Sequence, residues 1–263
     1  MASALRPAPC MAVHTTPDIQ LASSVIEAAM LTRILLIGIL GGAMAGSAAS
    51  LVQGTVLQPM IVLAEAAEAA QPEREAVSDH DHGEHEHTHG SDEEPPGDPI
   101  VRKISTAVAV ICTAMGYGLM LSGVLALCRK QGWRAGLTLG AIGFLSFQLA
   151  PGLGIPPQPP GMPSYDVHMR QLWWLLTAFG TLGASFSAIQ GVRRRKVALL
   201  TTSLALIALP HILRFWLPGT GPLPELAYLT TPFVLASFAM TAVLWLSLGA
   251  AVGFLQARIP PYA

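Results

Sequence analysis

Six apolar segments, most of them long enough to cross a lipid bilayer, constrain this chain more than any other feature. A transmembrane helix needs about 20 consecutive, mostly apolar residues. Only 12% of the 263 residues are charged, whereas about 25% is usual in soluble domains. We therefore expect an all-α fold, a polytopic membrane helix bundle with about six transmembrane helices. The expected spans are residues 34–64, 104–127, 135–149, 172–190, 197–217 and 233–255.

Glycine and proline indicate where these spans pack closely or break. Gly42 and Gly46 have the GxxxG spacing that lets two helices approach each other in lipid, although small residues are common in any such helix. The span 135–149 is short, and the prolines between residues 151 and 163 are expected to prevent regular helix there. Pro210 is expected to interrupt the span 197–217.

Composition divides the chain into an N-terminal extension and a membrane domain that contains one long polar loop. Residues 1–30 have no signal-peptide core and are expected to be a disordered N-terminal extension, with translation beginning at Met30. Residues 31–263 form the membrane domain. Within it, residues 65–100 are polar and acidic, which favours disorder. The three cysteines show no disulfide or zinc-site spacing.

Five histidines and four acidic residues are concentrated between residues 79 and 89 of this loop. Neutral imidazole suits divalent metals such as zinc, copper, nickel and iron, and carboxylates can complete the coordination shell. The cluster predicts a metal-binding loop, and the alternative is a solvated acidic loop that happens to carry histidines. Protons should compete with the metal below about pH 6. The predicted metal ligands are His80, His82, His85, His87, His89, Asp79, Asp81, Glu84 and Glu86.

The distribution of basic residues predicts how the spans are oriented. With the N-terminus in the cytoplasm, ten of the 15 Lys and Arg residues fall on the cytoplasmic side and five on or near the outer side. Such a cytoplasmic excess is the usual bias in membrane proteins. Six spans then place both termini in the cytoplasm. The His-rich loop and the Pro-rich segment would share the outer, extracytoplasmic face with the loop around Glu225.

Polar side chains within or beside the spans are candidates for a permeation path, because ionisable groups in a membrane are costly and often functional. Asp166 and His168 together could bind a divalent ion, but Asp166 could instead form a helix-start salt bridge with Arg170. His211 could be a metal ligand, or it could bond a neighbouring carbonyl group. The candidate path residues are Gln148, Asp166, His168, His211 and Glu225.

The run APGLGIPPQPPGMP, residues 150–163, is followed by Asp166, Arg170, Gln171, Trp173 and Trp174. These residues closely resemble the pattern of the CbtA family, and residues 31–53 and the Gly132-Trp133-Arg134 turn are similar as well. The resemblance implies a bacterial inner-membrane cobalt transporter subunit, linked to cobalamin biosynthesis. It also implies a small single-span, histidine-bearing partner of the CbtB type. The family is often described with five spans, and it has an acidic residue where this chain has Gln158.

The function expected from these observations is cobalt uptake: the outer loop captures a divalent metal and the bundle passes it inward. One alternative is a membrane-anchored metal-binding or sensing protein that transports nothing; others are nickel or zinc transport, or efflux. No enzyme motif and no nucleotide-binding loop is present in the sequence, so we expect no enzyme activity, no nucleic-acid partner and no cofactor besides the bound or transported metal.

Overall fold

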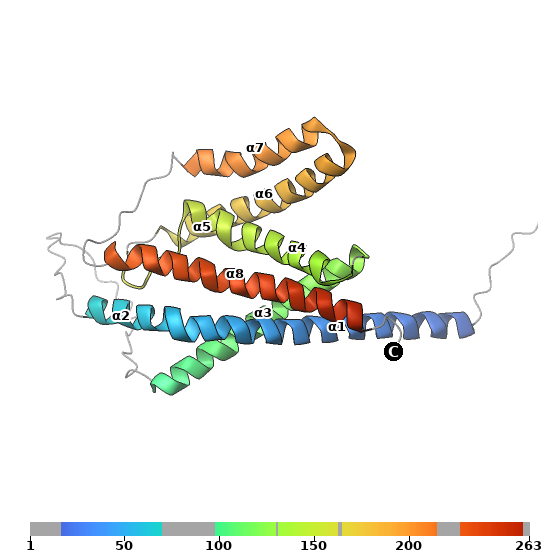
Figure 1. Ribbon diagram of the computed structural model, residues 1–263, viewed down its shortest axis with the longest axis horizontal. Helices are drawn as coiled ribbons and strands as arrows, with labels where there is room; N and C mark the ends of the chain where they lie inside the picture. The colour runs from blue at the N-terminus through green and yellow to red at the C-terminus, as the bar shows by residue number, and fades with distance from the viewer. Residues whose placement is uncertain (1–16, 70–97, 130, 163–164, 215–226, 260–263) are drawn as a thin grey trace, which may run out of the picture.

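A computed structural model describes residues 17–69, 98–129, 131–162, 165–214 and 227–259, and every regular element in these ranges is helical (Figure 1). Six of the described helical stretches are long and apolar enough to cross a membrane, which confirms the expected bundle. The elements are α1 (Pro17–Val52), η1 (Gln53–Leu57), α2 (Gln58–Ala69), α3 (Pro99–Leu127), α4 (Trp133–Phe144), η2 (Leu145–Leu149), α5 (Ala150–Gly154), α6 (Val167–Arg194), α7 (Val197–Arg214) and α8 (Ala227–Arg258).

Two wide π-helical turns, η1 and η2, lie just before prolines that the helices pass through, although regular helix was not expected at Pro151. Each turn ends two residues before a proline, Pro59 or Pro151. A proline lacks an N–H and clashes with the carbonyl group four residues earlier, and a local π turn relieves both problems. The third span therefore continues to Gly154, beyond the expected end at residue 149. Pro210 likewise lies inside a continuous α7.

The N-terminal prediction was wrong in part, because α1 already begins at Pro17. Residues 17–30 are helical, although residues 1–30 were expected to be disordered. Ala, Leu, Ile and Glu predominate between residues 19 and 30, and most of these are good helix formers. They extend the first transmembrane helix at the end opposite η1.

Close glycine contacts join α1, α3, α4 and α8 into one body. A Cβ atom added to Gly38 would lie 2.7 Å from the Cα atom of Leu119, and one added to Gly42 would lie 2.6 Å from the Ala114 carbonyl oxygen. Between α4 and α8, a Cβ atom added to Gly136 would clash with the Gly249 carbonyl oxygen, and one added to Gly249 would clash with the Gly136 carbonyl oxygen. Small residues allow such approach in membranes, where packing rather than water exclusion holds helices together.

Arg33 links the first and last described helices. Its Nε donates to the Ile259 carbonyl oxygen at 2.9 Å, and its Nη2 donates to the Gln256 carbonyl oxygen at 2.6 Å. The last carbonyl groups of a helix have no partner within the helix, and a basic side chain satisfies them well. Arg33 therefore caps α8 and fixes it beside α1.

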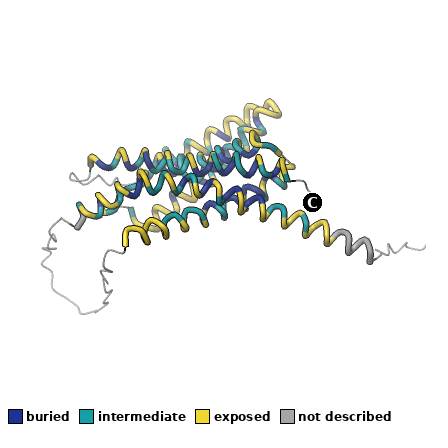
Figure 2. The backbone as a smooth tube through the Cα atoms, turned by 60° about the horizontal axis from the view of Figure 1, so that its bottom comes forward, coloured by how far each residue is buried: buried dark blue, intermediate teal, exposed yellow. Residues whose placement is uncertain are grey.

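The α6–α7 hairpin forms the upper edge of the molecule in Figure 1. The two helices pack on each other, and α6 contacts the rest of the bundle mainly through α4, η2 and α5. α7 is mostly exposed (Figure 2). Large apolar side chains such as Leu204 and Leu209 lie on its surface. An exposed apolar surface on a helix of this length is suited to contact with lipid.

Candidate functional site

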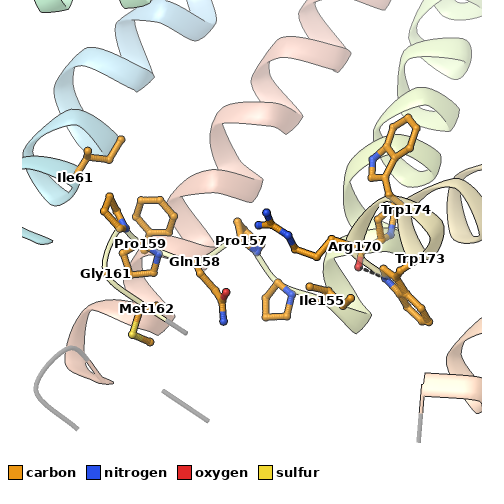
Figure 3. Close-up of a pocket in the computed structure, with 14 residues that line it drawn as sticks. Ile61, Ile155, Pro157, Gln158, Pro159, Gly161, Met162, Arg170, Trp173 and Trp174 are labelled. Atoms are coloured by element: carbon orange, nitrogen blue, oxygen red, sulfur yellow. Dashed lines mark hydrogen bonds between the residues drawn. The ribbon is translucent and has the colours of Figure 1, made fainter. Parts of the chain in front are cut away.

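A cavity of about 580 Å³ opens at the end of the bundle where α5 ends and α6 begins. The Pro-rich segment 155–160 forms one wall, and α2, α5, α6 and α8 contribute the others (Figure 3). Most lining side chains are apolar, and Arg170 is the only charged one among the described residues that line the cavity. The side chains that line it outside the Pro-rich segment include Ile61, Met162, Arg170, Trp173, Trp174 and Phe233.

The wall behind this pocket is the broken end of the α4–η2–α5 helix. Pro151 has no N–H to donate to the Phe147 carbonyl group, and Ile155 is extended, so the helix stops at Gly154. Such a stop leaves the last carbonyl groups of the helix without partners, which is costly at membrane depth. The carbonyl groups at this end are those of Phe147, Ala150, Pro151 and Gly154, and that of Pro151 also accepts from the Ile155 N–H at 3.0 Å.

Side chains from α6 and α7 contact each of these carbonyl groups. The indole N–H groups of Trp174 and Trp173 donate to Phe147 at 3.1 Å and to Pro151 at 2.9 Å. The His211 Nε2 atom lies 3.2 Å from the Ala150 oxygen. The Arg214 Nε atom donates to the Gly154 oxygen at 3.0 Å. A Cβ on Gly154 would clash with the Trp173 ring, so only glycine allows this close contact.

Asp166 begins α6 as its N-cap. Its Oδ2 atom accepts from the backbone N–H of His168 at 2.9 Å and of Met169 at 3.3 Å. Both bonds use the same oxygen, and Oδ1 has no protein partner among the described residues. The alternative salt bridge with Arg170 is absent from the ion pairs of the described residues. Asp166 and His168 are both exposed, so a carboxylate oxygen and an imidazole are available at this helix start.

His211 fits the structural alternative better than a role as metal ligand. Its Nδ1 atom lies 2.9 Å from the Ile207 carbonyl oxygen and its Nε2 atom faces Ala150, so both ring nitrogens are engaged. Gln148 lies in η2 and is half-buried. Glu225 and the nine predicted ligands between residues 79 and 89 lie outside the described residues.

The structure gives several residues a role that the sequence analysis did not assign to them. Trp173, Trp174 and Arg214 act as donors to a helix end, and Tyr165 receives a second bond from the Arg214 guanidinium. The prolines after Gly154 are the sequence feature from which these donors could have been predicted, because a helix that stops in a membrane needs hydrogen-bond donors from other helices. No group of three His, Cys, Asp or Glu side chains that could hold a metal occurs within the described residues.

The comparisons with known proteins give one clear result. No curated protein and no solved structure matches the chain. A family model described as "probable cobalt transporter subunit (CbtA)" matches residues 31–257, a range that covers all of the helices from α2 to α7 and most of α1 and α8. This protein is therefore a multi-pass membrane protein that belongs to the CbtA family of probable cobalt transporter subunits.

Proposed function

We propose that this chain is the membrane subunit of a cobalt uptake system of the bacterial inner membrane. Residues 79–89 capture the metal on the outer side, and Asp166 and His168 receive it at the mouth of the pocket. The bundle then passes the ion inward, together with a small single-span, histidine-bearing subunit of the CbtB type. Cobalt is the substrate, and a membrane potential of 100 mV would favour entry of a divalent ion by about 4.6 kcal/mol.

One observation carries this proposal: the helices that flank the His-rich loop reach the same end of the bundle as the pocket. Ile61 of α2 lines the pocket, and α2 continues to Ala69, about 12 Å further along the helix. Glu65 in the same stretch accepts a hydrogen bond of 2.8 Å from Arg102 of α3, so the two flanking helices are joined. A metal held by the loop would be released close to the pocket mouth.

The basic residues support an outward-facing pocket. Arg102, Lys103, Arg170 and Arg214 belong to the pocket end, whereas the α6–α7 turn at the opposite end carries four consecutive basic residues, 193–196. Cytoplasmic ends of membrane helices usually carry the larger basic excess. This assignment places the pocket and the His-rich loop outside, and both termini in the cytoplasm.

Substitutions at Asp166 test the proposal, because they separate charge from capping. Asparagine caps a helix about as well as aspartate, whereas alanine loses about 1 kcal/mol of capping free energy. We expect Asp166→Asn to keep the thermal stability of the wild type but to reduce cobalt uptake about tenfold, equivalent to about 1.4 kcal/mol. Radiolabelled cobalt accumulation would be measured in cells without their own cobalt uptake, with and without a CbtB-type subunit.

The alternatives predict different results in the same assay. If Asp166 serves only as a cap, Asp166→Asn will transport normally and Asp166→Ala will merely be less stable. Metal binding by purified protein without accumulation in cells would favour a binding or sensing protein. Lower accumulation than in cells with empty vector would indicate efflux, and competition by nickel or zinc would identify a different substrate.

Deletion of residues 79–89 gives a second test. If the loop concentrates metal for a transporter, the deletion should raise the half-saturating cobalt concentration about tenfold, or about 1.4 kcal/mol, and leave the maximal rate unchanged. A protein that only binds metal should lose its function at every concentration. Replacing the five histidines by asparagine, with the acidic residues kept, controls for loop length and for charge.

A further inference from the structure

His211 makes two contacts that a neutral imidazole cannot both satisfy as hydrogen bonds. Its Nδ1 atom lies 2.9 Å from the Ile207 carbonyl oxygen, and its Nε2 atom lies 3.2 Å from the Ala150 carbonyl oxygen. A neutral ring carries one N–H, whereas an imidazolium carries two. The neutral form would therefore direct a nitrogen lone pair at a carbonyl oxygen, and only the protonated form donates to both.

The surroundings hold this ring between fixed groups. The Trp173 ring contacts it edge-on from α6, with 5.6 Å between the ring centroids. Trp173 itself donates to the Pro151 carbonyl group, so the imidazole cannot push the Trp173 ring aside without disturbing the α5 end. Movement of the imidazole is therefore a poor way to relieve the mismatch, and a change of protonation state is the remaining one.

Three segments near His211, namely α7, α6 and the stretch before α6, carry charged and titratable groups. On α7, Arg214 lies one turn further on, and its guanidinium is engaged by Gly154 and by Tyr165 from the segment before α6. α6 contributes Arg170 beside Trp173, and Asp166 and His168 at its start. η2 and α5 contain no titratable side chain.

We propose that His211 is a proton-binding site that joins α7 to the end of α5. With the proton bound, the ring donates to both carbonyl groups and the α6–α7 hairpin is held against the α5 end. Loss of the proton removes one of the two bonds and loosens this joint. The joint borders the pocket through Trp173 and Pro151, so, if the proposed transport function holds, a proton controls the shape of the outer pocket.

A distance measurement across the joint tests this without metal or transport. Spin labels would be placed at Leu153→Cys on α5 and Ile212→Cys on α7, two side chains that are 66% and 55% exposed, after Cys10, Cys112 and Cys128 are replaced by serine. The distance distribution would be recorded by pulsed electron paramagnetic resonance in lipid nanodiscs at pH 5 and pH 8. We expect one narrow distribution at pH 5 and a broader or longer one at pH 8.

Variants of His211 decide whether this residue is responsible. His211→Gln keeps one donor but does not titrate, and His211→Phe keeps the ring but has no donor, so both should remove the pH dependence. His168→Gln removes an exposed histidine from the neighbouring helix and should keep the wild-type change of the distance distribution with pH. The proposal is overturned if the wild-type distribution does not change with pH, or if the change persists in either His211 variant. A joint that responds to pH in a protein that moves no cobalt would contradict the transport function alone.

Discussion

Gly118→Ala is expected to force α3 away from α1 and to destabilise the folded protein by about 3 kcal/mol, at the upper end of the usual cost of overpacking. The added Cβ atom would clash with the Gly38 carbonyl oxygen and would also lie 3.1 Å from the Gly42 backbone nitrogen. Backbone atoms of a helix cannot rotate away as a side chain can, so the helices must separate. Thermal unfolding in detergent, followed by the loss of monodisperse protein on gel filtration, would measure the effect.

Gly116→Ala provides the matched control two residues earlier on the same helix. A Cβ atom at Gly116 would have no neighbour within 4 Å. Alanine has a better helix propensity than glycine by up to about 1 kcal/mol, so this variant should be as stable as the wild type or slightly more stable. Equal losses in the two variants would contradict the close α1–α3 contact described above.

Trp173→Ala should have the second large effect, a destabilisation of about 3–5 kcal/mol. The side chain is 5% exposed, and its removal leaves a cavity beside the α5 end. It also leaves the Pro151 carbonyl group without its indole donor. Trp173→Phe keeps most of the volume and should lose only the hydrogen bond, about 1–2 kcal/mol. The same thermal assay measures both variants.

The neighbouring tryptophan is the control for this prediction. Trp174 is 39% exposed and donates a longer bond, of 3.1 Å, to the Phe147 carbonyl group. We expect Trp174→Phe to cost less than Trp173→Phe. If Trp174→Phe cost more, the bond to the Phe147 carbonyl group would contribute more to stability than the bond to the Pro151 carbonyl group.

The sequence was sufficient to predict the helices but not their ends. Long apolar runs predict spans directly, because each must satisfy its own backbone in lipid. The third span was expected to end just before Pro151. The π turn that precedes this proline could not be predicted, since it depends on how the backbone relaxes around the pyrrolidine ring of Pro151. The predicted GxxxG pair identified the packing face of α1. The spacing of the glycines alone could not show that α3 is the helix that packs on this face.

The site was predicted less well for a different physical reason. The sequence shows which side chains are ionisable. It does not show which backbone carbonyl groups will bond to them, because every residue carries the same carbonyl group. Asp166, His168 and His211 were all singled out as path candidates. The structure engages both nitrogens of His211 and one oxygen of Asp166 with the backbone, and leaves the second Asp166 oxygen and the exposed His168 available.

The contact between α1 and α8 has a consequence for how the protein is made. Ribosomes deliver the helices in order, so α1 and α3 can pair early, and the α6–α7 hairpin can form before α8 has been synthesised. The small-residue faces of α1 and α4 that α8 covers stay unpaired until then. Arg33 finds its two carbonyl partners at Gln256 and Ile259 only after nearly the whole chain has entered the bilayer. Chains that terminate before α8 should therefore present unfinished surfaces to the proteases that monitor membrane insertion.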